Sequence, residues 1–221
     1  SLYNFFDKNN IDSKKAKLLK NFISYDQIPI QFMDQVHGNN SQMITSYSSS
    51  PKKDTDALIT RESNIALAAL SADCLPITLS KSDGSQFAII HAGWEGLFSG
   101  VIESSLSCFT GNKKDLRAWI GPSISRENYE VGNDLAIKIE ETEEFRFNSH
   151  ILEEKFKKLF FNLSLFIKDK LSANKIKSFG DVKIDTYTNK NFFSHRRTTQ
   201  NKCASLLKND SGRQVSVIGL K

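Results

Sequence analysis

The chain has 221 residues, of which 39% are hydrophobic and 25% are charged, and this balance is ordinary for a globular protein. No apolar stretch approaches the roughly 18–20 residues of a membrane-spanning helix, so the composition predicts no membrane partner. The formal net charge of +5 would suit a polyanion, but the basic residues are interspersed with acidic ones. Because the aromatic-basic pattern of an RNA-binding sheet is also missing, we expect no nucleic-acid partner.

The cysteine content indicates the redox environment of the protein. The three cysteines, Cys74, Cys108 and Cys203, are an odd number at irregular spacing. Such a set argues against a disulfide framework and for a reducing compartment, so we expect a cytoplasmic protein. The length favours one domain over residues 1–221, and no internal repeat or low-complexity segment divides the chain.

The first half of the chain predicts one helix followed by short strands. Apolar residues at helical spacing predict a helix over about 12–24, and Pro29 ends it. Apolar runs then predict strands at 30–36, 43–47, 57–60 and 65–70, and the last two are typical of strands covered on both faces. Two further strands flank a turn at 82–85, and the second of them ends at His91.

The second half mixes helices and strands. Helices are expected at 94–109, at 135–144 and over most of 153–171, where a strand-like segment at 159–161 interrupts the pattern. Strands are expected at 116–120, 182–184 and 214–220, and the loop at 189–212 has the length of a functional loop. Because many strands come in adjacent pairs, we predict an α+β fold, a layered α/β domain of mixed sheets with helices outside. No glycine-rich phosphate-binding loop follows any strand.

Three residues with metal-binding or nucleophilic side chains lie at the ends of predicted strands. His37 follows the 30–36 strand, Cys74 follows the 65–70 strand, and His91 ends a later one. Two imidazoles and a thiolate suit zinc, and three protein ligands leave a fourth position open, which is the catalytic arrangement. The same residues suit a Cys74 nucleophile with His91 or His37 as its base. A packed thiol with two hydrogen-bonded histidines is the ordinary structural alternative.

Seven short motifs occur in an order that resembles a known family. They are QVHG at 35–38, DTDA at 54–57, SADCLP at 71–76, HAGWEG at 91–96, IGPSIS at 120–125, YEVG at 129–132 and FFSHRR at 192–197. Together they resemble the YfiH-type laccase-domain family, described as purine nucleoside phosphorylases with accompanying adenosine deaminase activity. The resemblance spans nearly the whole chain and implies zinc held by His37, Cys74 and His91. It also implies an α/β/β/α-like fold related to the catalytic domain of cytotoxic necrotizing factor, which uses a Cys-His pair.

The resemblance implies phosphorolysis of purine nucleosides, namely adenosine, inosine, guanosine and methylthioadenosine, with phosphate as the co-substrate. A guanidinium holds phosphate with paired donors, and the candidates are Arg196, Arg197 and Arg213. Asp73 is a candidate acid–base group or ligand-orienting residue beside Cys74, so we predict catalytic roles for Asp73, Cys74, His37 and His91. Further residues are expected to line the site (Gln35 and Ser71) or to stack a purine (Trp94 and Phe193).

One departure from the family motif and the number of histidines both bear on this interpretation. The family motif reads HAGWRG, whereas this chain has Glu95 in place of the arginine and so an anion in place of a cation. A multicopper centre needs many more histidines than the four in this chain, which excludes it, whereas a single copper ion suits the same ligands as zinc. Two alternatives therefore stay open: a metal-free Cys-His hydrolase or amidase, and a metal- or purine-binding protein with reduced activity. A monomer and a dimer are equally compatible with the sequence.

Overall fold

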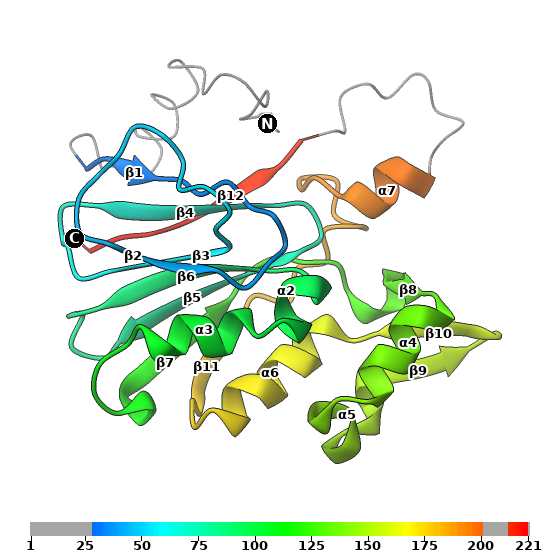
Figure 1. Ribbon diagram of the computed structural model, residues 1–221. Coiled ribbons are helices and arrows are strands. Elements are labelled where there is room, and N and C mark those ends of the chain that lie inside the picture. The colour runs from blue at the N-terminus through cyan, green and yellow to red at the C-terminus, as the bar shows by residue number, and fades with distance from the viewer. Residues whose placement is uncertain (1–27, 201–211, 221) are drawn as a thin grey trace.

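The computed structural model describes residues 28–200 and 212–220 (Figure 1). The helix predicted at about 12–24 and Cys203 lie outside these residues. Among the helices that the structure describes, none has both the length and the apolar character needed to cross a membrane. The described strands form three sheets.

The centre of the fold is a six-stranded sheet with the order β11-β7-β5-β6-β3-β2. β2 pairs with β3 and β7 with β11 in parallel, and the other pairs are antiparallel, so the sheet is mixed. Every residue of β3 and β6 is buried, as expected for apolar strands covered on both faces. In chain order the strands are β2 (Ser41–Ile44), β3 (Ala57–Thr60), β5 (Leu75–Lys81), β6 (Phe87–Ala92), β7 (Leu116–Ile120) and β11 (Ser178–Asp181).

Different layers cover the two faces of this sheet (Figure 1). On one face a three-stranded sheet packs through an apolar cluster that includes Leu58, Leu67 and Ile89. On the other face two helices pack through residues such as Ile102 and Phe166. The covering sheet consists of β1 (Ile30–Gln31), β4 (Ala66–Ser71) and β12 (Gln214–Ile218), and the helices are α3 (Val101–Ser107) and α6 (Leu163–Ala173). This stack of helices, sheet and sheet confirms the predicted layered α/β fold.

A third, smaller sheet lies beside α6 in Figure 1 and has the order β8-β10-β9. Aromatic rings join it to the main core, because the centroid of Phe161 lies 5.7 Å from that of Tyr129 and 5.6 Å from that of Phe166. The elements of this region are β8 (Glu130–Val131), α4 (Asn133–Glu140), α5 (Glu143–Phe147), β9 (Leu152–Lys155) and β10 (Lys158–Phe161). Short 3-10 helices lie at Lys113–Asp115, Arg126–Asn128 and Ser149–Ile151.

The prediction of a helix over most of 153–171 is wrong for its first part. Residues 152–161 form the hairpin of β9 and β10, whose turn residues Phe156 and Lys157 have φ angles of 53° and 60°. Left-handed backbone at both positions matches the twist of a two-residue hairpin. Neither residue is the glycine or asparagine that marks such a turn in a sequence, so the helix α6 begins only at Leu163.

The helix predicted at 94–109 is two helices. Gly100 has a φ of 89°, and this left-handed residue separates α2 (Trp94–Phe98) from α3. Glycine adopts that conformation without the steric cost that other residues meet, so it ends helices readily. The helix predicted at 135–144 likewise divides into α4 and α5.

Three further boundaries differ from the prediction. The strand predicted at 30–36 is only Ile30–Gln31, and Met33 then makes an isolated bridge to Lys52. The strand predicted at 182–184 lies earlier, at β11, because its parallel pairing with β7 uses residues 178–181. The loop predicted at 189–212 contains the helix α7 (His195–Gln200).

Candidate functional site

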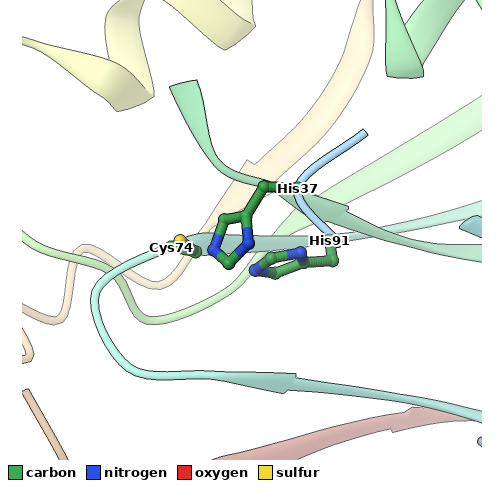
Figure 2. A group of neighbouring side chains, drawn as sticks. All are labelled: His37, Cys74 and His91. Carbon is green, nitrogen blue, oxygen red and sulfur yellow. The ribbon is translucent and has the colours of Figure 1, made fainter. Parts of the chain in front are cut away.

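Three side chains from distant parts of the sequence meet in one place (Figure 2). His37 lies in the loop between β1 and β2, Cys74 immediately precedes β5, and His91 lies in β6. Their ligand atoms all lie within 4.8 Å of one another, and the two imidazole centroids are 4.8 Å apart. His91 is buried, Cys74 is half-buried and His37 is exposed, so the group opens to solvent on the side of His37.

Two glycines of the HAGWEG segment allow this close approach. A Cβ on Gly93 would lie 2.9 Å from Cδ2 of His37 and 3.3 Å from Sγ of Cys74. A Cβ on Gly96 would lie 2.7 Å from the main-chain oxygen of Gly38. Any larger residue at these positions would push the His37 loop away from Cys74, so both glycines are needed for the geometry of the site.

Asp56 is a site residue to which the sequence assigned no role. It is fully buried and lies just before β3, a strand with no exposed residue. Its Oδ1 accepts a hydrogen bond from Nδ1 of His91 at 2.9 Å, and its carboxylate also accepts main-chain N–H groups from residues 36, 37 and 38. Two features of the sequence could have pointed to Asp56, namely its place in the DTDA motif and its position next to an apolar strand. Neither feature identifies the groups that donate hydrogen bonds to it.

The charges of these groups depend on one another. Burial raises the pKa of the Cys74 thiol, but hydrogen bonds from His37 and His91 and their charges lower it to about 6. Burial lowers the pKa of His91, but hydrogen bonds to Asp56 and Cys74 raise it to about 9. Burial raises the pKa of Asp56, but hydrogen bonds from His91 and Gly38 hold it below its ordinary value. In the metal-free site these shifts favour a thiolate at Cys74 and a protonated imidazole at His91.

These residues fit a metal ion. Imidazole nitrogen and thiolate sulfur are ligands that zinc and copper bind in proteins, and three of them leave one position for water or substrate. Asp56 engages Nδ1 of His91, which leaves Nε2 for the ion, as in carboxylate–histidine–metal arrangements. Because His91 must give up a proton to act as a ligand, the metal and the proton compete for the site.

Asp73 is buried and joins the cysteine loop to two other segments. Its φ of 83° turns the backbone immediately before Cys74. Oδ1 accepts the hydroxyl of Thr186 at 2.7 Å, and Oδ2 accepts the hydroxyl of Ser194 at 3.0 Å and the main-chain N–H of Arg196 at 2.7 Å. Thr186 and Ser194 escaped the sequence prediction because they lie 113 and 121 residues from Asp73 along the chain.

All three candidate arginines donate to main-chain oxygens. The guanidinium of Arg197 donates to the carbonyl oxygens of residues 186, 187 and 192, so it braces the loop that precedes α7. Arg213 is exposed and donates to the carbonyl oxygen of its neighbour Gly212. These contacts give Arg197 a clear structural role.

Arg196 lies against Tyr129. Its guanidinium carbon is 5.5 Å from the centroid of the Tyr129 ring, and one of its nitrogens donates to the main-chain oxygen of Glu130 at 2.8 Å. Burial raises the pKa of the Tyr129 hydroxyl, and the charge of Cys74 raises it further. The Tyr129 hydroxyl therefore lies in the electrostatic surroundings of Cys74, and the Arg196 cation lies against the Tyr129 ring.

Gln35 and Ser71 support the backbone next to the site. The side-chain amide of Gln35 donates to the carbonyl oxygen of Leu70 at 2.7 Å and accepts the N–H of the same residue at 2.8 Å. Ser71, the last residue of β4, accepts a hydrogen bond from the side chain of Gln214 at 3.4 Å. Both residues therefore hold the segment that leads from β4 into Cys74.

The two aromatic residues considered for stacking are both engaged in packing. Phe193 is only 2% exposed, and a Cβ on Gly212 would lie 2.4 Å from its ring. Trp94 is half-buried at the start of α2, where its ring centroid lies 6.0 Å from that of Phe98 and 5.3 Å from Nζ of Lys138. Both rings are therefore already in contact with neighbouring residues.

Comparison with known proteins finds relatives over nearly the whole chain. The family model described as "Multi-copper polyphenol oxidoreductase laccase" matches residues 4–221. The "Purine nucleoside phosphorylase" of Haemophilus influenzae is 30% identical over 216 residues, which cover 96% of this chain and 82% of that protein. The "Purine nucleoside phosphorylase YfiH" of Escherichia coli is 36% identical over 104 residues, and that match covers 47% of this chain and less than half, 42%, of that protein.

A solved structure shows the same architecture. The crystal structure of the hypothetical protein YfiH from Bacillus licheniformis superimposes with a TM-score of 0.85 and 25% identity. The superposition covers 99% of this chain and 85% of that one. With the family model matched over nearly the whole chain, the seven motifs in order and the same layered fold, the chain belongs to the YfiH-type laccase-domain family.

Proposed function

We propose that this protein is a zinc-dependent purine nucleoside phosphorylase that acts on adenosine, inosine, guanosine and methylthioadenosine and also deaminates adenosine. The observation that carries the proposal is the meeting of His37, Cys74 and His91 within 4.8 Å. Relatives named purine nucleoside phosphorylase, at 30–36% identity, support it. The odd, irregular cysteines support a place in the cytoplasm.

In phosphorolysis the bond between C1′ of the ribose and N9 of the purine breaks, and a bond between C1′ and a phosphate oxygen forms. The purine leaves with the bonding electrons and takes up a proton, while the ribosyl group carries positive charge in the transition state. His37, Cys74 and His91 would hold the zinc ion, which when bound would polarise an oxygen or activate water for deamination. Arg196 would hold phosphate with the guanidinium donors that Glu130 does not use.

The remaining candidates act in this proposal mainly by position. Asp73 fixes the Cys74 loop against the segment before α7 through its bonds to Thr186, Ser194 and Arg196. Gln35 and Ser71 hold the backbone that leads into Cys74. The exposed Arg213 and the loop-bracing Arg197 take lesser parts in phosphate binding than Arg196.

Metal analysis and a phosphate-dependent assay test the proposal together. We expect the purified protein to carry zinc near equimolar with the chain and to convert inosine and phosphate to hypoxanthine and ribose 1-phosphate. Omitting phosphate should abolish hypoxanthine release, and adenosine should give inosine in addition to adenine. Stoichiometric copper in place of zinc would change the metal assignment. A fully zinc-loaded protein that converts none of the four nucleosides would contradict the phosphorylase itself.

The low pKa of Cys74 favours a second candidate, a metal-free Cys-His hydrolase or amidase in which Cys74 is the nucleophile. A thiolate is the reactive form, so alkylation by iodoacetamide reports its titration. In metal-free protein we expect the labelling rate of Cys74 to rise with pH, to reach half its maximum at about pH 6 and to level off above pH 7 or so. For a thiol with the ordinary pKa of 9.0, the labelling rate would still rise with pH at pH 8.

Labelling at each cysteine is read by peptide mass mapping, with Cys108 as the internal control. Cys108 is half-buried, and its thiol donates to the main-chain oxygen of Ser104 at 3.6 Å. Prior addition of zinc should protect Cys74 and leave Cys108 unchanged. If zinc leaves the labelling of Cys74 unchanged and the metal-free protein hydrolyses an amide, the nucleophile interpretation displaces the zinc site.

A further inference from the structure

The carboxylate of Asp56 accepts four hydrogen bonds, two at each oxygen. Oδ1 accepts Nδ1–H of His91 at 2.9 Å and the main-chain N–H of His37 at 3.0 Å. Oδ2 accepts the main-chain N–H of Gly38 at 2.8 Å and that of Val36 at 3.2 Å. The side chain is 0% exposed, and an ionised carboxylate so deeply buried is stable only where donors satisfy it. These four hydrogen bonds therefore stabilise the ionised carboxylate of Asp56.

The first consequence concerns the ring of His91. An ionised carboxylate only accepts hydrogen bonds, so Nδ1 of His91 must carry the proton that is shared with Asp56. The opposite nitrogen, Nε2, is then the one left for Cys74 or a metal ion. The contact also orients the ring, because Nδ1 lies 2.9 Å from a buried side chain that three main-chain N–H groups hold in place.

The second consequence concerns the backbone of His37. This residue has a φ of 62°, a left-handed conformation that a residue with a side chain adopts only where its surroundings hold it. Asp56 accepts the N–H groups of His37 and of both its neighbours, so three successive peptide groups point at one carboxylate. The carboxylate thereby holds the strained turn that carries the imidazole of His37.

We propose that Asp56 is the positioning residue of the metal centre. One buried carboxylate selects the Nδ1–H tautomer of His91 and fixes the peptide groups around His37, so that two of the three ligands are oriented toward Cys74 before a metal binds. Asp56 acts through the two histidines and does not touch the metal. The inference rests on the metal-binding part of the proposed function and is independent of which nucleoside the protein converts.

The substitution Asp56→Asn is informative because no orientation of the amide satisfies the four donors. If the NH₂ group takes the place of Oδ1, it faces Nδ1 of His91 and the N–H of His37. His91 can then only accept at Nδ1, and its proton moves to Nε2, the nitrogen that the metal needs. If the NH₂ group takes the place of Oδ2, it faces two main-chain N–H groups instead, and the turn of His37 loses its support.

Asp54→Asn is the matched control. Asp54 lies two residues earlier in the same motif, is exposed, and its carboxylate has no hydrogen-bond partner in the part of the chain that the structure describes. Its φ of 49° is a conformation that asparagine accepts readily. We expect zinc affinity, measured by competition with a chelator, to fall about 10- to 100-fold in Asp56→Asn and to stay at the wild-type value in Asp54→Asn.

Two spectroscopic readouts separate positioning from general loss of structure. In zinc-loaded wild-type protein, long-range ¹H–¹⁵N spectra should place the His91 proton on Nδ1 and the metal on Nε2, and this measurement needs no variant to fold. Metal on Nδ1 would overturn the inference. In cobalt-loaded protein, Asp56→Asn should change the visible absorption bands while far-ultraviolet circular dichroism stays as in the wild type.

The outcomes distinguish this inference from the proposed function. Equal zinc affinity and equal cobalt spectra for Asp56→Asn and the wild type would overturn the role of Asp56 and leave the phosphorylase proposal intact. Tight zinc binding that depends on Asp56, without nucleoside turnover, would contradict only the phosphorylase. A wild-type chain that takes up no zinc would overturn the metal centre and the positioning role together.

Discussion

Replacing Cys74 with alanine is expected to abolish zinc retention and nucleoside phosphorolysis together. The substitution removes the anionic ligand of the group and leaves the two imidazoles. In the protein that still contains Cys74, the pKa of one of them, His91, is raised to about 9. Loss of a direct ligand should weaken zinc affinity by more than about 100-fold, since losing an outer-shell partner alone costs 10- to 100-fold. Metal content by elemental analysis and hypoxanthine release from inosine measure the two effects.

Cys108→Ala is the matched control for this experiment. Cys108 lies at the C-terminal end of α3, and its thiol donates to the main-chain oxygen of Ser104 in that helix, so replacing this side chain should leave zinc and turnover unchanged. A Cys74→Ala protein that keeps full turnover would remove Cys74 from the reaction. One that keeps its zinc but loses turnover would favour the nucleophile over the ligand.

Replacing Arg196 with alanine is expected to raise the KM for phosphate about 10- to 100-fold, with a much smaller effect on the KM for inosine. Charged hydrogen bonds contribute roughly 1.5–3 kcal/mol each, which corresponds to that range. The effect should be large because Glu95 stands where the HAGWRG motif of the family has an arginine. This chain therefore has fewer cations to hold the phosphate. Initial rates at varied phosphate and saturating inosine give the measurement.

The design of this variant separates phosphate binding from folding. The main-chain N–H of Arg196, which Asp73 accepts at 2.7 Å, is present in alanine as well, so the anchor of α7 is kept. Arg213→Ala removes an equal charge from an exposed position, where the guanidinium donates to the adjacent carbonyl oxygen. A phosphate KM in Arg196→Ala that equals the wild-type value would show that Arg196 does not hold phosphate, and we expect the smaller rise in Arg213→Ala.

The sequence predicted the parts of the fold that short-range patterns control. The strands at 57–60 and 116–120 have the predicted bounds, because apolar runs flanked by turn residues define them locally. The hairpin at 152–161 was missed because its turn uses Phe156 and Lys157 in left-handed conformations without a glycine. The break between α2 and α3 was missed as well, since the apolar spacing continues across Gly100.

For the site as well, some features could be predicted from the sequence and others were found only in the structure. The chemistry of His37, Cys74 and His91 could be identified by residue type, as could the motifs of the family. The predicted place at a strand end was wrong for His37, because β1 already ends at Gln31. The hydrogen bonds of Asp56 were found only in the tertiary structure, because its partner His91 lies 35 residues away and its other donors are main-chain N–H groups, which any sequence has. The difference between Arg196 and Arg197 was also decided there, because neighbouring residues of one type differ only in what the fold places around them. Sequence thus determined which atoms are available for chemistry, and the packing of distant segments determined which of them are oriented and which are already engaged.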